Sequence, residues 1–262
     1  MKEIGNMQKT NLFDKIKQRW IRFRFKPIPI FVFHSVSEEY NPMLWCRCDW
    51  TQTELFKKNI LNLKKRYKFI ALPNAQKHLK EDKMRFKNYA VLTADDGYRS
   101  VLDVLPWLEQ QKIPITLFVN TKYLDKKSWS VINERQARKT KPDVNMIMEV
   151  CPDLYMSKEE LFNIVSENVM IGLHGSEHID ATKVSEEAFR NNVEDCIKEL
   201  DWHPRYIPYF AYTWGHHNNY TDAVLKEFGL TTVLTGGSMN YRNTMDRICI
   251  DGENYITLLS IQ

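Results

Sequence analysis

The feature that most constrains the fold is a regular alternation of short apolar segments with longer amphipathic ones. The apolar segments are rich in β-branched and aromatic residues and have the length of buried strands; they span residues 30–33, 69–72, 89–93, 115–119, 169–173, 206–211 and 231–234. The amphipathic segments have helical spacing and fill the intervals at residues 53–67, 99–111, 158–165, 185–200 and 221–228. Strands that alternate with helices pair in parallel. The sequence therefore predicts an α/β barrel of parallel strands.

Two segments depart from this alternation. Residues 125–156 form a long, charged connection with no clear period, which predicts an insertion in a single domain covering residues 28–262. Residues 1–27 form a lead-in that ends at Pro27, and its residues 15–26 hold six cations interleaved with apolar residues at helical spacing. Such a basic amphipathic helix fits peripheral contact with an anionic membrane, but it equally fits a helix docked on its own domain.

Composition excludes several classes of protein. A net charge of +4 on 262 residues is too small for a typical nucleic-acid binder, so no nucleic-acid partner is expected. No apolar run approaches the roughly 18 residues needed to span a bilayer. The amino terminus is polar where a secretory leader is apolar, which predicts a cytoplasmic location, peripheral to the inner face of the membrane if the basic helix binds there. The sequence does not indicate an oligomeric state.

Titratable and polar side chains gather where the predicted strands end. In a barrel of parallel strands these ends converge on one face, which is where such enzymes place their chemistry. The residues concerned are His34, Asp95, Asp96, Asn120, His174 and His178.

Two of these clusters have both an ordinary and a chemical interpretation. The Asp-Asp-Gly segment at residues 95–97 is explained by a turn that caps the next helix, and His174 and His178 by hydrogen-bonded imidazoles. Taken together, however, two His and one Asp make a three-ligand site with a position open for water, as in catalytic zinc sites. The remaining Asp lies beside the metal, where it could take a proton from water.

The same residues resemble the polysaccharide deacetylases of carbohydrate esterase family four. Residues 93–97 (TADDG) are similar to the family's Thr-Phe-Asp-Asp-Gly motif, and residues 171–178 (IGLHGSEH) to its His-x-x-x-His motif. The resemblance implies a deformed (β/α) barrel of about seven strands that removes acetyl groups from sugars. It also implies that Asp95 is the catalytic base and that Asp96, His174 and His178 bind one divalent metal ion, for which zinc is expected.

The third family motif is altered. Residues 210–215 (FAYTWG) are similar to Phe-Arg-x-Pro-Tyr-Gly, with Ala211 where many members have the Arg that orients the base. Arg247, from the end of the chain, is a candidate substitute, although a surface salt bridge explains it equally well. The resemblance implies that the Trp214 amide stabilises the oxyanion. Candidate sugar contacts are Tyr212, Trp214, His216, His217 and Asn120.

The family's late Leu-x-His motif, whose His is the general acid, has no counterpart at residues 231–240. Residues 30–36 (IFVFHSV) resemble the segment that opens another branch of the family, in which the first strand contributes the acid. His34 is therefore the candidate acid, because an imidazole can hold a proton near neutral pH. His216 and His217 compete for this role.

These residues predict a metal-dependent hydrolase that removes an acetyl group from an N-acetylated sugar. In a cytoplasmic protein the substrate is expected to be a glycan precursor, either nucleotide-linked or lipid-linked. Two alternatives stay open: a carbohydrate-binding pseudoenzyme that keeps the metal site, and another metal-dependent hydrolase such as a phosphoesterase.

Overall fold

The computed structural model describes residues 28–41, 44, 47–81, 88–124, 154–235 and 246–252. The basic segment 1–27 and all but the last three residues of the 125–156 insertion lie outside these ranges. The expectations of an amino-terminal helix, of membrane contact and of an insertion therefore stay predictions. In the described part of the chain, no helix is both long enough and apolar enough to cross a bilayer.

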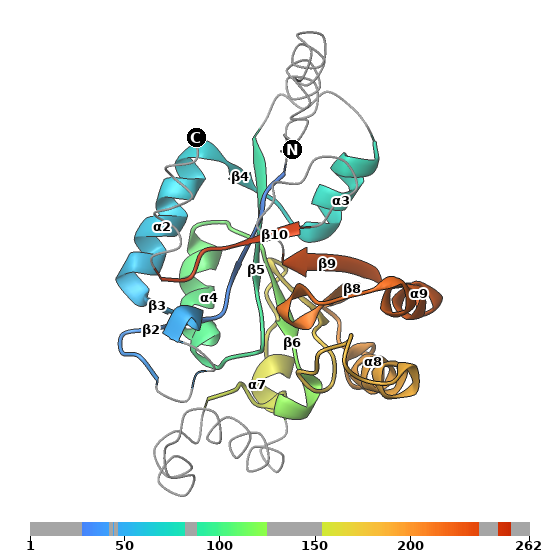
Figure 1. Ribbon diagram of the computed structural model, residues 1–262. Helices are drawn as coiled ribbons and strands as arrows, with labels where there is room; N and C mark the ends of the chain where they lie inside the picture. The colour runs from blue at the N-terminus through green and yellow to red at the C-terminus, as the bar shows by residue number, and fades with distance from the viewer. Residues whose placement is uncertain are drawn as a thin grey trace, which may run out of the picture.

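Within the described residues, seven parallel strands close into a ring (Figure 1). Each strand pairs with the next, and the last pairs with the first. In order around the ring they are β1 (Ile30–Phe33), β5 (Tyr89–Ala94), β6 (Ile115–Val119), β7 (Val169–Leu173), β8 (Tyr206–Ala211), β9 (Thr231–Thr235) and β10 (Asp246–Cys249). This is the deformed (β/α) barrel that the sequence predicted.

One strand of the ring differs from the expected set. The segment 69–72 contributes only β4 (Lys68–Phe69), a two-residue strand that pairs with β5 outside the ring. Its expected continuation begins α3 (Leu72–Lys80) instead, because Pro73 is compatible with the first turn of a helix. The place in the ring is taken by β10, a strand too short and too polar at its start to stand out as an apolar run.

The predicted helices form, with ends shifted by a few residues. They surround the sheet as α2 (Thr53–Arg66), α4 (Ser100–Gln110), α7 (Lys158–Phe162), α8 (Glu186–Leu200) and α9 (Asn219–Glu227) (Figure 1). Helix α8 illustrates why they form. The Ser185 side chain accepts a hydrogen bond from the Ala188 N–H, which caps the first turn. Phe189, Val193 and Cys196 then recur at helical spacing on its buried face.

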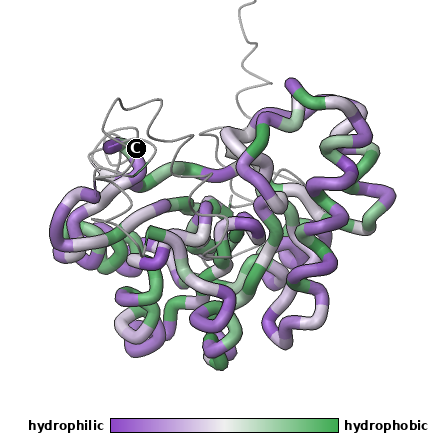
Figure 2. The backbone as a smooth tube through the Cα atoms, turned by 90° about the horizontal axis from the view of Figure 1, so that it is seen from below, coloured by the Kyte–Doolittle hydropathy of each residue, from purple (hydrophilic) through white to green (hydrophobic). Residues whose placement is uncertain are grey.

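The core has two parts, one inside the ring and one between the ring and its helices. The inner part combines alternate residues of the strands with the buried face of α3; it contains Ile28, Ile30, Leu72, Ala75, Leu79, Val91, Phe118, Tyr209, Ala211 and Val233. The outer part is larger and lies under α2, α4 and α8. Figure 2 shows hydrophobic segments gathered toward the middle of the molecule. A ring packed in this way holds the carboxyl ends of its strands at fixed positions around one rim.

A short second sheet extends from that rim. Its strands, β2 (Ser35–Ser37) and β3 (Trp50–Gln52), pair in parallel directly after His34. Because β2 follows β1 after a single residue, His34 is held between two strands.

Candidate active site

The turn after β5 places two adjacent carboxylates at the rim. Asp96 and Gly97 both adopt left-handed backbone conformations, with φ of 69° and 77°. This conformation is uncommon outside glycine, although Asp tolerates it better than most residues. The resulting turn sends the Asp95 and Asp96 side chains to different partners. Strained backbone of this kind is typical of functional sites.

Asp96 lies between two imidazoles. Its Oδ1 atom is 3.2 Å from Nε2 of His174 and 3.3 Å from Nε2 of His178. His174 follows β7, and its Nδ1–H donates a hydrogen bond of 2.8 Å to the Ala211 carbonyl on β8. A neutral ring that donates through Nδ1 presents the lone pair of Nε2 to Asp96. Burial favours the protonated form of Asp96, but His178 and His174 hold the pKa of this carboxyl well below its usual value.

This trio fits a divalent metal ion. The three side chains place one ligand atom each within 4.8 Å of one another. Asp96 Oδ1 is buried, and no group among the described residues donates a well-aligned hydrogen bond to it, despite the two nearby nitrogens. The oxygen of Asp96 and the two imidazole nitrogens are therefore candidate ligand atoms. The hydrogen bond from His174 to a backbone carbonyl is the usual support for a metal-binding imidazole.

Asp95 has a permanent cation as its partner. Arg247 on β10 donates two hydrogen bonds of 2.6 Å, from Nη1 and Nη2, to the two oxygens of Asp95. The Arg247 side chain is fully buried, and its guanidinium lies 5.3 Å from the Phe118 ring centre. Burial raises the pKa of Asp95, but Arg247 and His174 more than offset this and lower it. Arg247 is therefore a buried partner of Asp95 and not a surface salt-bridge residue.

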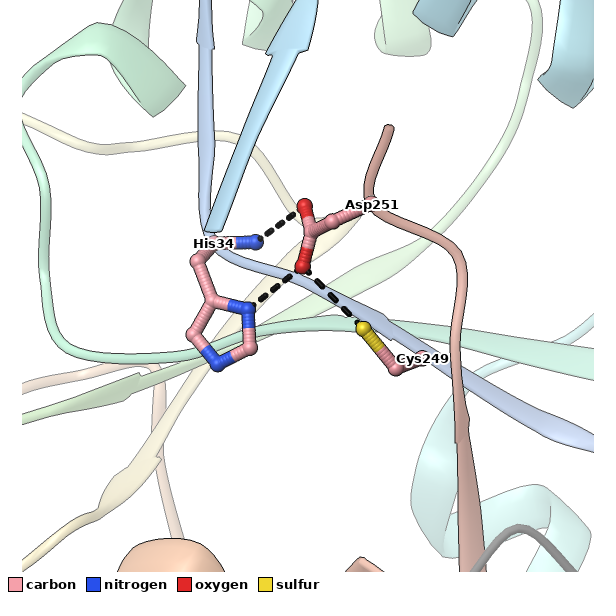
Figure 3. A group of neighbouring side chains, drawn as sticks. All are labelled: His34, Cys249 and Asp251. Carbon is pink, nitrogen blue, oxygen red and sulfur yellow. Dashed lines mark hydrogen bonds and ion pairs between the residues drawn. The ribbon is translucent and has the colours of Figure 1, made fainter. Parts of the chain in front are cut away.

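His34 belongs to a second cluster, on the β1 and β10 side of the rim (Figure 3). Its Nδ1 lies 2.6 Å from Oδ2 of Asp251, and its backbone N–H donates to Oδ1 of the same residue at 3.0 Å. The Cys249 thiol donates to Asp251 Oδ2 at 3.3 Å. Burial disfavours the charged imidazole, but Asp251 raises the pKa of His34 well above its ordinary value. Nε2 of His34 points away from Asp251 in Figure 3.

The loop after β8 carries three exposed ring side chains, Trp214, His216 and His217. Trp214 has a left-handed backbone with φ of 54°, is 42% exposed, and meets the His178 ring edge-on at 4.4 Å between ring centres. His216 and His217 are also exposed, and each donates through Nδ1 to a carboxylate, to Asp180 at 2.9 Å and to Asp222 at 3.1 Å respectively.

Two of the expected sugar contacts are corrected by their placement. Tyr212 is 1% exposed, and its hydroxyl donates to Asp222 at 2.9 Å; its ring packs between the strands and the helices, against Phe189 of α8. Asn120 is fully buried, and its side-chain amide donates to the His174 carbonyl at 2.7 Å. Neither side chain reaches solvent. Asn120 instead fixes the backbone of the loop that carries a candidate metal ligand.

Comparison with known proteins identifies the family. The sequence model described as polysaccharide deacetylase matches residues 82–233, more than half of the chain. The chain belongs to the polysaccharide deacetylase family. No curated protein sequence matches it.

Solved structures of deacetylases share the fold. Streptococcus pyogenes deacetylase PplD, in complex with acetate, has a TM-score of 0.67 and 16% identity over 90% of this chain and 98% of its own. IcaB from Ammonifex degensii has a TM-score of 0.69 and 17% identity, covering 89% of this chain and 96% of its own. A de-N-acetylase from Aggregatibacter actinomycetemcomitans has a TM-score of 0.62 and 14% identity, covering 89% and 99%.

The sequence did not reveal the partners of His34 in this member of the deacetylase family. Cys249 is the last residue of β10 and Asp251 lies just after it, and β10 is a strand that no apolar run predicts. A signal was present in the alternation of Ile248 and Ile250 with polar residues, which is typical of a strand buried on one face. Tyr123 was also missed; its hydroxyl accepts a hydrogen bond from the His178 backbone N–H at 3.4 Å.

Proposed function

We propose that this chain is a metal-dependent hydrolase that removes the acetyl group from an N-acetylated sugar. The observation that carries the proposal is the pair of adjacent carboxylates, Asp96 between two imidazoles and Asp95 against a buried guanidinium. A single metal site beside one separate carboxylate suits hydrolysis of an acyl group by an activated water. Family membership and the deacetylase names of the structural neighbours support the same reaction.

Asp96, His174 and His178 would hold the ion. When bound, a divalent ion supplies Lewis-acid polarisation of the acyl carbonyl and lowers the pKa of water, and the nitrogen and carboxylate donors suit zinc. The hydrogen bond from His174 to the Ala211 carbonyl keeps Nε2 aimed at the site. The low pKa of Asp96 keeps this carboxylate ionised and ready to bind at neutral pH.

Asp95 takes the proton of the attacking water. Because Arg247 lowers the pKa of Asp95, the carboxylate is unprotonated at neutral pH and can accept a proton. The two parallel hydrogen bonds from Arg247 fix the carboxylate plane. We propose that Arg247 orients Asp95 from β10, the role that the family resemblance gives to an arginine at position 211, and this supports an enzyme over a pseudoenzyme.

His34 gives a proton to the departing nitrogen. Asp251 binds Nδ1, so Nε2 is the nitrogen left to deliver the proton. The raised pKa of His34 keeps the ring protonated at neutral pH, as a general acid requires. The Trp214 backbone amide is proposed to donate to the oxyanion, and its exposed ring to stack on the sugar.

We further propose that the substrate is a glycan precursor in the cytoplasm, either nucleotide-linked or lipid-linked. The test is to measure acetate release from three classes of acceptor: nucleotide-linked N-acetylhexosamine, its lipid-linked form and a chito-oligosaccharide. Elemental analysis gives the bound metal, and a phosphate assay runs in parallel. Acetate without phosphate is expected. Phosphate release would favour a phosphoesterase, and a metal-loaded protein that releases neither product would be a binding module.

A further inference from the structure

The cluster of His34, Cys249 and Asp251 contains a thiol to which the proposed reaction assigns no role. The three side chains place Nδ1, Sγ and a carboxylate oxygen within 4.8 Å of one another (Figure 3). Asp251 is fully buried, whereas the His34 ring is 20% exposed. Cys249 is also partly exposed, so the cluster can be reached from solvent.

The buried Asp251 carboxylate requires a positive charge beside it. A buried carboxylate is costly unless it is paired with a cation or a metal. Asp251 accepts hydrogen bonds from the backbone and ring of His34 and from the Cys249 thiol. A proton on the His34 ring meets the requirement, and a divalent cation bound to the same atoms would meet it equally well.

The donor set selects the kind of cation. A thiolate, an imidazole and one carboxylate favour soft or borderline ions such as Zn²⁺ and Cd²⁺ over Mg²⁺ or Mn²⁺, which prefer oxygen. We propose that His34, Cys249 and Asp251 form a second, inhibitory site for a thiophilic divalent cation, which competes with the proton on His34. The inhibitory part rests on the proposed function, in which His34 is the acid. The binding part does not.

The proton balance follows from the ligands. The cation bonds to Cys249 Sγ, to His34 Nδ1 and to Asp251 Oδ2; the thiol loses its proton, and the imidazolium loses the proton on Nδ1. Both protons go to solvent, and no electron moves. His34 is left neutral, with its Nε2 proton no longer acidic enough to protonate a leaving amine.

Binding is therefore expected to strengthen as pH rises, because metal displaces protons. The two protons displaced are those of the His34 ring and the Cys249 thiol, both of which contact Oδ2 of the buried Asp251. Two further carboxylates that interact electrostatically with His34 are Asp95 and Asp96, in the turn after β5.

The experiment titrates the full chain, already loaded with zinc at the catalytic site, with Zn²⁺, Cd²⁺ or Mg²⁺. Metal per chain is measured after removal of free ion, and Cd²⁺ binding is followed by the ultraviolet thiolate-to-cadmium absorption. The wild type should bind one more equivalent of Zn²⁺ or Cd²⁺ than Cys249→Ala, and no extra Mg²⁺. Cys196→Ala, which removes the buried thiol on α8, is the matched control and should behave as the wild type.

Inhibition is measured as each variant's rate with excess Zn²⁺ divided by its own rate without it. A decrease of about tenfold or more in the wild type at pH 8, weaker at pH 6 and lost in Cys249→Ala, is expected; a shift of this size corresponds to about 1.4 kcal/mol. Equal metal content in the wild type and Cys249→Ala would overturn the site. The two proposals fail separately: a Cys249-dependent second ion in a chain that releases no acetate leaves the site standing, and acetate release without such an ion leaves the function standing.

Discussion

The two clusters at the rim both combine histidine with aspartate, but the imidazole rings have opposite orientations. In the trio of Asp96, His174 and His178, the His174 ring donates through Nδ1 to a backbone carbonyl and faces the carboxylate with Nε2. In the second cluster, the His34 ring contacts Asp251 through Nδ1, and Nε2 points away from Asp251 (Figure 3). Under the proposed function, the first arrangement binds a cation and the second holds a proton for the leaving nitrogen.

The adjacent carboxylates of Asp95 and Asp96 also differ in the partners that surround them. Asp95 is satisfied by a guanidinium that never loses its charge, whereas Asp96 faces imidazoles whose charge depends on protonation or on a bound ion. Under the proposed function, Asp95 with its fixed cation acts as the base, and Asp96 between two imidazoles acts as a metal ligand. The role of each carboxylate would then follow from its partners and not from its residue type.

The largest expected effect separates Asp95 from Asp96. Asp96→Asn should lose the metal and lower turnover by about 10³-fold or more, since a Lewis-acidic ion supplies several kcal/mol. Asp95→Asn should keep the metal and lower turnover by about 10²–10⁴-fold, the usual contribution of a general base. Elemental analysis and acetate release measure both, with His78→Gln on the distant α3 as control. Metal loss in Asp95→Asn would erase the distinction between the two carboxylates.

His34→Ala tests whether the second cluster delivers a proton. Cleavage of an N-acetyl amide should decrease by about 10²–10⁴-fold, because a poor leaving group needs an acid. Cleavage of an activated acetyl ester should change far less, since its leaving group departs without a proton. The ratio of the two rates is the measurement. If both substrates lose activity equally, His34 binds or stabilises rather than protonates.

Arg247 tests the fixed ion pair. Arg247→Ala leaves Asp95 buried without its cation and should lower the free energy of unfolding by about 3–5 kcal/mol. Because Arg247 lowers the pKa of Asp95, the pair stabilises the fold above the unfolded-state pKa of Asp95, and that contribution is lost as pH falls through the folded-state pKa.

Denaturant titration from pH 7 to pH 3 measures both effects. Arg247→Lys should recover part of the stability but less of the turnover, since it lacks the planar fork. Arg190→Ala, which removes a partly exposed arginine paired with Glu186 and Glu227, is the control and should change the stability much less than Arg247→Ala. An Arg247→Ala protein as stable as this control would show that the ion pair contributes little.

The smallest expected effect is a shift in pH dependence. In the wild type, the decrease of turnover at alkaline pH should have its midpoint above pH ~6.5, the ordinary pKa of histidine. The reason is that Asp251 raises the pKa of His34. Asp251→Asn removes that charge while burial remains, so the midpoint should move to lower pH. The same interaction stabilises the fold below the unfolded-state pKa of His34 and is lost as pH rises through the folded-state pKa. An unmoved midpoint in Asp251→Asn would assign the alkaline decrease to another group.

Local patterns in the sequence determined the strand and helix alternation, the barrel and the Asp96, His174 and His178 trio. These predictions succeed because each depends on residues that are neighbours in the chain. Strands are predicted from apolar runs, and the trio is predicted from the ends of strands and from two His four residues apart. The same reasoning misplaced Tyr212 and Asn120, because a residue's position beside a motif does not say whether its side chain packs inward. It also predicted a strand of the ring at residues 69–72, whereas helix α3 begins at Leu72, with Pro73 in its first turn.

What only the tertiary structure decided is the closure of the ring by β10. That strand brings Arg247 to Asp95 across 152 residues of chain and Asp251 to His34 across 217. Partners so far apart leave no local periodicity, and they meet because β10 pairs with β1 on one side and β9 on the other. The sequence by itself pointed to the candidate metal ligands and the candidate base, whereas the closed barrel brings Arg247 to Asp95 and Asp251 to His34.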